Sequence, residues 1–251
     1  MSKNQFNIEK NINDLLHKLL GNLGVSDDDI LYNSKSRKGI NKKESMVKIE
    51  LMNKDMKDKF CKILLFYQCM RRASEGMKEI SKENRFAEYA VDNELLLGLV
   101  SIIDWLAYSS QYAKCTGFLE KFNAFLERNL KKDNDDYRKI KKMLENLSIK
   151  NKEDKTIKLS DYHPRKERSS DLLYKFGCYV YEIRSYFVHY ATLGGMYPYD
   201  IDFSISNTMD SNTMEVDKIV RMLKPEMVRN ILWKAVFLYF GLGDICVIRY
   251  K

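Results

Sequence analysis

Proline and glycine are scarce in this chain of 251 residues, which contains three prolines and eleven glycines. These are the residues that most strongly interrupt helices and strands, so their scarcity favours long uninterrupted elements. Lys, Glu, Leu and Met are common, and all four have high helix propensities. The composition therefore predicts an all-α protein with a chain long enough to bury a sizeable core.

Clustered cysteines are also missing. The chain has five cysteines, none of them in a CxxC pair, and several stand among apolar neighbours. An odd number of dispersed, apolar-flanked cysteines is typical of reduced structural thiols in a cytosolic protein. We therefore expect a cytoplasmic protein with no disulfide framework, no metal site and no cofactor.

No hydrophobic run is long enough to predict a membrane span. The two most apolar stretches, residues 95–108 and 231–243, are short and contain Asp104 and Lys234. Both are expected to be core helices, and the polar N-terminus does not resemble a signal peptide. We interpret Asp104 as a buried carboxylate satisfied by a nearby hydroxyl or arginine.

Positive charge is present in excess, with a formal net charge of +8 and a pI of about 9.0. Residues 35–59 carry nine Lys/Arg against four Asp/Glu, and residues 131–168 carry thirteen against eight. Each region has a net charge of +5, so the rest of the chain is close to neutral. Two basic regions indicate an anionic partner such as RNA, although a solvated Lys-rich surface explains them as well.

The order of the patterns predicts two regions. Residues 1–55 are expected to form a small helical, basic N-terminal extension, with a helix at 7–20 and one short strand within 46–52. Residues 56–251 are expected to form the main helical domain. Within this domain the periodicity indicates helices over 56–148, a long exposed connection over 149–168, a helix from Asp171 to about Ala191, a long loop over 192–213, and a last helix or helix pair over 214–243 that is broken or restarted at Pro225.

One stretch of the expected helix ending near Ala191 combines residues that suit RNA cleavage. "EIRSYFVH" places Arg184 five residues before His189. A histidine titrates near neutral pH and can exchange protons with the 2′-hydroxyl or the 5′-oxygen of RNA. An arginine offers a permanently charged fork of donors for the phosphate. DNA lacks the 2′-hydroxyl, so such a site acts on RNA only.

The spacing of this pair raises a geometric question. Residues five positions apart on a straight α-helix lie about 140° apart around its axis, so their side chains do not converge. The helix must therefore distort near its end, or two copies must meet across a two-fold axis so that both pairs line one cleft.

The Arg-x4-His motif, Arg184-Ser185-Tyr186-Phe187-Val188-His189, resembles that of the HEPN superfamily of helical domains. The resemblance implies a HEPN-like helical bundle in which Arg184 and His189 are catalytic. Many members are metal-independent ribonucleases of prokaryotic toxin–antitoxin, abortive-infection and CRISPR-linked defence systems, and they form homodimers with a composite active site. The implied activity is RNA endonuclease cleavage that leaves 2′,3′-cyclic phosphate ends, and an antitoxin or another defence component is a further possible partner.

Three neighbours of the pair are supporting candidates. Ser185 stands where many family members have a polar residue, often Asn. Glu182 is placed to orient Arg184 or to face solvent, and Tyr190 is placed to stack on a base. Because Tyr190 follows His189 directly, we do not carry over the tyrosine modification known for some toxins, whose tyrosine lies two residues after the histidine.

Structural roles explain the same residues without catalysis. Arg184 can pair with Glu182 or Asp171, and His189 can cap the C-terminus of its helix, where a cation is favoured. The protein is then a non-catalytic RNA-binding module that uses the basic regions 35–59 and 131–168, or a protein-interaction module of a defence complex.

Overall fold

The computed structural model describes residues 51–80, 85–108, 117–150, 155–164, 169–190, 221–222 and 225–243. The helix expected at 7–20, residues 46–50 of the expected strand and the loop over 192–213 lie outside these residues. The described end of the expected strand, Leu51 and Met52, is not a strand. The boundary placed between residues 55 and 56 stays a prediction.

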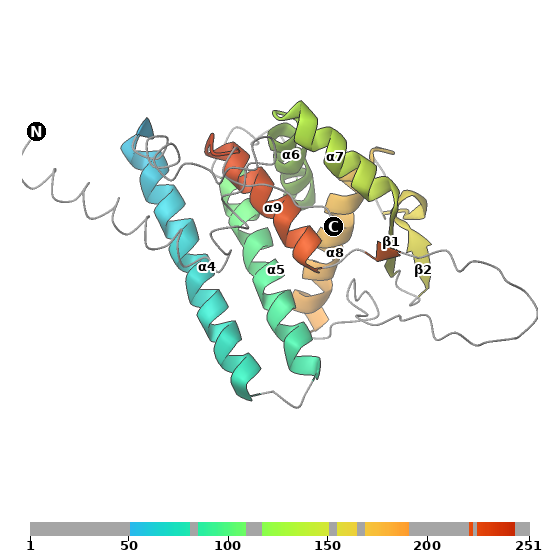
Figure 1. Ribbon diagram of the computed structural model, residues 1–251, viewed down its shortest axis with the longest axis horizontal. Helices are drawn as coiled ribbons and strands as arrows, with labels where there is room; N and C mark the ends of the chain where they lie inside the picture. The colour runs from blue at the N-terminus through green and yellow to red at the C-terminus, as the bar shows by residue number, and fades with distance from the viewer. Residues whose placement is uncertain are drawn as a thin grey trace, which may run out of the picture.

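The described residues are mostly helical, as the composition predicts (Figure 1). They form six α-helices, a three-stranded sheet and one 3₁₀ turn. In chain order the elements are α4 (Lys54–Ile80), α5 (Arg85–Tyr108), α6 (Phe118–Leu130), α7 (Asn134–Glu145), β1 (Leu147–Lys150), β2 (Thr156–Lys158), η1 (Leu159–Asp161), α8 (Leu172–Tyr190), β3 (Arg221–Met222) and α9 (Pro225–Tyr239).

Helix α5 is the centre of the fold. Its sequence is apolar nearly all round, and the helix packs against α4, α9, α6 and α8. Figure 1 shows α4 and α5 as a long pair, with α9 lying across the front of α5 and α8 behind. An α-helix that is hydrophobic on most sides is stable in water only when other elements surround it, which accounts for this central place.

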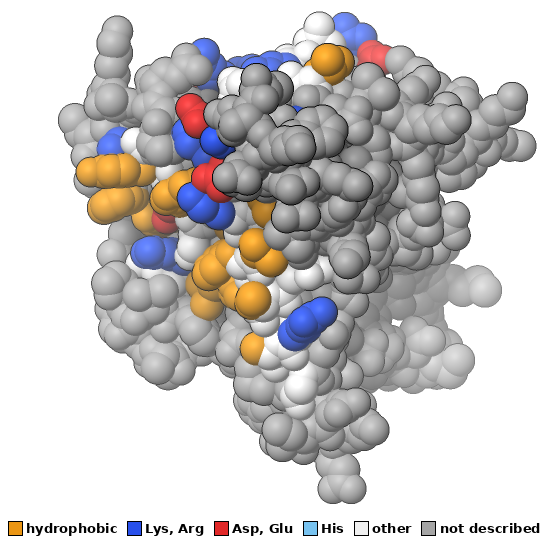
Figure 2. Space-filling model, turned by 90° about the vertical axis from the view of Figure 1, so that its left-hand side faces the viewer, with side chains coloured by type: hydrophobic (Ala, Val, Ile, Leu, Met, Phe, Trp, Pro, Cys, Tyr) orange, Lys and Arg blue, Asp and Glu red, His pale blue; other side chains and the backbone are white. Residues whose placement is uncertain are grey.

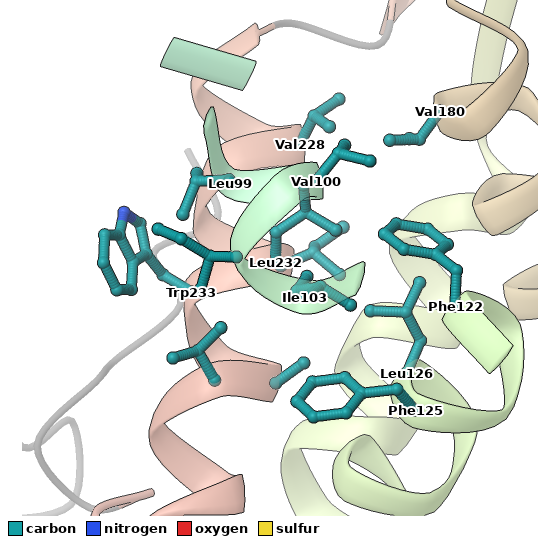
Figure 3. Packing of buried hydrophobic residues seen from close by; sticks show 14 of the residues in the cluster. Leu99, Val100, Ile103, Phe122, Phe125, Leu126, Val180, Val228, Leu232 and Trp233 are labelled. Atoms are coloured by element: carbon teal, nitrogen blue, oxygen red, sulfur yellow. The ribbon is translucent and has the colours of Figure 1, made fainter. Parts of the chain in front are cut away.

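The core joins these helices into one hydrophobic cluster (Figure 3). Leu99 of α5 lies on the side of α9, and Ile103 lies toward Phe125 and Leu126 of α6. The residues that Figure 3 labels are all at most 8% exposed. They are Leu99, Val100, Ile103, Phe122, Phe125, Leu126, Val180, Val228, Leu232 and Trp233.

The ends of α9 follow the signals in the sequence. Pro225 is the first helical residue, so it starts a new helix, one of the two alternatives that the sequence leaves open. Gly241 has a φ of +75°, which favours glycine. Its N–H donates to Leu238 O over 3.1 Å and the Leu242 N–H donates to Phe237 O over 2.8 Å, so a Schellman motif closes the helix.

The small sheet corrects two predictions. Residues 149–168 are not a long exposed connection, because β1 pairs antiparallel with β2 there and Ile149, Leu159 and Tyr162 are buried. The residues just before Pro225 are not helical throughout, because Arg221–Met222 forms β3 and pairs parallel with β1. Residues 149–168 contain many Lys side chains, so their few apolar positions do not form a recognisable pattern. Strand β3 is too short to show an alternating pattern.

Candidate functional site at the junction of α5 and α8

Helix α8 carries the Arg-x4-His motif, and its start is fixed by a side-chain cap. Asp171 Oδ1 accepts a hydrogen bond of 3.1 Å from the Leu173 N–H, as expected for an N-cap residue. Its other oxygen, Oδ2, accepts one of 3.2 Å from the Tyr137 hydroxyl of α7. Arg184 lies thirteen residues further along, about 20 Å by the rise of an α-helix. Asp171 therefore caps α8 and does not pair with Arg184.

The helix continues through the motif without a break. The backbone is α-helical from Leu172 to Tyr190, so no distortion brings Arg184 and His189 together. The two residues are about 140° apart around the axis and about 7.5 Å apart along it. The side chains of His189 and Tyr190 lie outside the part of the chain that the structure describes.

Arg184 itself is half-buried and rests on an aromatic ring. Its guanidinium carbon Cζ lies 5.4 Å from the ring centroid of Tyr181, one turn earlier on α8. The Tyr181 ring is in turn 5.6 Å from Phe122 of α6. A guanidinium over an aromatic face is attracted by the ring quadrupole and keeps its donors available at the edge. This contact holds the Arg184 guanidinium beside Tyr181, which packs on Phe122 of the core.

A carboxylate from α5 completes the surroundings of Arg184. Burial raises the pKa of Asp104, the nearby charge of Arg184 lowers it, and the result is a pKa of about 6. Burial also raises the pKa of Tyr181, and so does Asp104. Asp104 Oδ1 is buried and accepts no hydrogen bond from the described residues. The two charges therefore interact through space, without a hydrogen bond at this oxygen.

The sequence interpretation of Asp104 was right about its neighbour and wrong about one of its oxygens. It expected a buried carboxylate satisfied by a nearby hydroxyl or arginine. The neighbouring arginine is the one in the motif, but Oδ1 has no hydrogen-bond partner among the described residues. It did not connect Asp104 with the candidate site, because no sequence pattern indicates that α5 and α8 meet there. A carboxylate beside an arginine attracts the guanidinium, so Asp104 is suited to positioning Arg184. The only sequence signal was an acidic residue inside the most apolar helix.

The supporting candidates take different positions. Glu182 lies about 200° around α8 from Arg184, on the side that faces Tyr162. Burial raises the pKa of Tyr162, and the neighbouring Glu182 carboxylate raises it further. Glu182 thus interacts with Tyr162, and the carboxylate that acts on Arg184 is Asp104. Ser185 is half-buried beside Arg184.

Part of the basic region 131–168 forms an exposed face on α7. This helix begins at the N-cap Asp133, whose side chain accepts a hydrogen bond from the Asp136 N–H over 3.1 Å. Its apolar residues Ile140 and Leu144 are buried. The opposite face presents four exposed basic side chains, Arg138, Lys139, Lys141 and Lys142.

Searches with protein-family models, among curated proteins and among solved structures found no significant match to this chain. Within the described residues, no helix is long and apolar enough to cross a membrane. No group of three or more His, Cys, Asp or Glu side chains is arranged to hold a metal ion in that same part of the chain.

Proposed function

We propose that the protein is a metal-independent RNA endonuclease of HEPN type that acts as a homodimer. The observation that carries the proposal is the surroundings of Arg184, which lies on α8 beside an acidic group with a pKa of about 6. The mostly helical core and the resemblance of Arg184–His189 to the HEPN motif support the same activity. A role in antiviral defence or in a toxin system follows from that resemblance.

The cleavage step uses the 2′-hydroxyl of the substrate as nucleophile. His189 takes part in the proton transfers, removing the 2′-proton or protonating the 5′-oxygen that leaves. The bond from the 2′-oxygen to phosphorus forms while the bond to the 5′-oxygen breaks. Arg184 donates hydrogen bonds to the phosphate and offsets its developing negative charge. The products are a 2′,3′-cyclic phosphate and a 5′-hydroxyl.

The regular geometry of α8 supports a composite site. Positions 184 and 189 lie about 140° apart around one unbroken helix, a spacing that favours a phosphate bound by Arg184 of one copy and His189 of another. A two-fold axis beside the C-terminal half of α8 would set the Arg184 of one copy opposite the His189 of the other. The dimer is therefore part of the proposed mechanism.

Asp104 acts in this scheme as a positioning residue. Above pH 6 it is a carboxylate and attracts Arg184 toward α5, and below pH 6 the neutral acid releases that attraction. The position of the guanidinium thus depends on the charge of Asp104. Asp104→Asn keeps the shape of the side chain and removes this control.

A second function, RNA binding without cleavage, is favoured by the exposed basic face of α7. Lysine and arginine side chains on one helix face bind the phosphates of a nucleic acid irrespective of its sequence, and the affinity of such binding falls strongly as the salt concentration rises. Replacing Lys141 and Lys142 by Gln tests this function, because affinity for RNA falls and its salt dependence weakens. Cleavage by the wild-type protein rules out the purely non-catalytic alternative.

The experiment that tests the proposal is incubation of the purified protein with single-stranded RNA in EDTA. We expect cleavage whose 5′ products end in 2′,3′-cyclic phosphate. A matched oligonucleotide with a 2′-deoxyribose at the cleaved position should stay intact, because it has no nucleophile. Cleavage of that oligonucleotide, or no cleavage of any RNA by the dimer, contradicts the proposal.

A further inference from the structure

An unusual group of aromatic side chains lies on the surface near the candidate site. Trp105 and Tyr108 of α5 are 43% and 67% exposed, and Phe118 at the start of α6 is 61% exposed. Figure 2 shows hydrophobic side chains at the surface on the side that carries α4, next to Lys and Arg side chains. We call Trp105, Tyr108, Phe118 and Lys121 the aromatic patch.

The four residues form one continuous surface. Trp105 and Tyr108 are three positions apart on α5, and Phe118 and Lys121 are three positions apart on α6, so each pair shares a helix face. Lys121 Nζ lies 4.6 Å from the ring centroid of Tyr108, which joins the two faces. The patch therefore presents exposed aromatic rings of two helices, with a positive charge beside Tyr108.

The patch also adjoins the candidate site. Tyr108 is four residues after Asp104 on α5, so both side chains lie on the same side of the helix and one turn apart. Asp104 acts electrostatically on Arg184 and Tyr181 of α8. An RNA strand bound across the patch and along α5 would therefore extend toward Arg184.

We propose that the aromatic patch binds the bases of single-stranded RNA next to the cleavage site. This inference rests on the proposed function and adds the substrate class, an unpaired strand. Aromatic rings stack on bases of any sequence, and a lysine beside them attracts the backbone phosphate. Bases in a duplex are already stacked and paired, so double-stranded RNA does not use the patch. The charge of Lys121 and the continuity with Arg184 favour RNA over a purely apolar protein partner.

Tryptophan fluorescence tests this contact directly, because the chain has only two tryptophans. Trp233 is buried at 8% exposure, so Trp105 is the only one accessible. In a His189→Ala background, which prevents cleavage, the variant Trp233→Phe reports on Trp105 alone. We expect saturable quenching by a twelve-residue oligouridine or oligoadenosine, and none by a duplex of the same length. Should Trp233→Phe not fold, the difference between His189→Ala and His189→Ala/Trp105→Phe gives the same signal.

Affinity measurements provide the matched controls. Trp105→Ala and Tyr108→Ala should each weaken binding of labelled single-stranded RNA about tenfold, as loss of one stacked base does. Tyr108→Phe keeps the ring and should keep the affinity. Phe66→Ala, at an exposed aromatic of α4 outside the patch, should leave it unchanged.

The outcomes separate this inference from the proposed function. Unchanged Trp105 emission at saturating RNA, or no RNA binding at all, overturns the inference. Emission that changes with protein concentration in the absence of RNA assigns the patch to contact between copies and also overturns it. If the protein cleaves RNA but RNA does not change the emission of Trp105, the proposed function stands and this inference fails. If RNA quenches Trp105 but the wild-type protein does not cleave, the binding surface stands and the proposed function fails.

Discussion

Lys234 of α9 is buried at 2% exposure and forms an ion pair with Asp136 in the first turn of α7. The same ammonium group donates a hydrogen bond of 2.6 Å to Gly243 O, and Asp133 Oδ2 lies 3.7 Å away. Burial favours the neutral form of Asp136, but the hydrogen bond and charge of Lys234 lower its pKa below the ordinary value. The Lys234 side chain thus connects the start of α7, through its ion pair with Asp136, to the segment that follows α9, through its hydrogen bond to Gly243.

Lys234→Met is expected to lower the free energy of unfolding by about 3 kcal/mol, because it leaves Asp136 without its buried partner. Lys139→Met is the matched control, since Lys139 also pairs with Asp136, at 3.3 Å, but on the exposed surface. That change should cost less than about 1 kcal/mol. Urea unfolding followed by circular dichroism measures both, and equal losses would show that burial of Lys234 is unimportant.

Gly177→Ala is expected to weaken the contact between α8 and α6. A Cβ atom at this position would lie 2.0 Å from Asn123 Oδ1, and the Asn123 side chain amide is held by a 3.5 Å hydrogen bond to Cys178 Sγ. We expect a loss of about 1–3 kcal/mol in thermal or urea unfolding.

Gly76→Ala in α4 is its control, because nothing lies within 4 Å of the added methyl group. Alanine has the higher helix propensity, so this variant should be stabilised by up to about 1 kcal/mol. A Gly177→Ala protein as stable as the wild type would contradict the close packing of α8 on α6.

Asp104 should make stability depend on pH in a particular direction. Its pKa in the folded protein is about 6, above the ordinary 3.8, so the folded state binds the proton more tightly than the unfolded state does. Its contribution to stability is therefore full below about pH 4 and is lost as pH rises to about 6. The difference in unfolding free energy between wild type and Asp104→Asn should change over this window and level off above it.

Two further variants sharpen the test of Asp104. Arg184→Gln removes the positive charge that lowers the pKa of Asp104, so the window should extend above pH 6. Asp58→Asn changes an exposed carboxylate of α4 that pairs with Lys62. It should leave the pH dependence between pH 4 and 6 as in the wild type. A wild type and Asp104→Asn with parallel pH profiles would show that Asp104 titrates normally.

The helices could be predicted from the sequence because their signals are local. The apolar periodicity, the cap at Asp171 and the restart at Pro225 all act within a few residues. The small sheet could not be predicted, because β1 finds a partner in β3, more than seventy residues away in the sequence. Short strands like these carry no periodic pattern of their own.

Only the part of the candidate site that lies within one helix could be predicted from the sequence. Arg184 and His189 share one helix, so their spacing alone raised the possibility of a site. Asp104 and the aromatic patch belong to α5 and α6, and only the packing of these helices against α8 places them nearby. Glu182 is two residues from Arg184 in sequence, yet the helical twist turns it toward Tyr162.

The most direct test of the central claim is RNA cleavage in EDTA by Arg184→Ala, His189→Ala and an equimolar, re-dimerised mixture of the two. Each variant alone should be at least about a hundredfold slower than wild type, while His163→Ala, an exposed histidine, should be unaffected. The mixture should recover up to about a quarter of wild-type activity. Half of its dimers are mixed, and each mixed dimer has one complete pair, the Arg184 of one copy with the His189 of the other, while its second pair lacks both residues. Wild-type rates in both single variants, or no recovery in the mixture, would contradict a composite Arg184–His189 site.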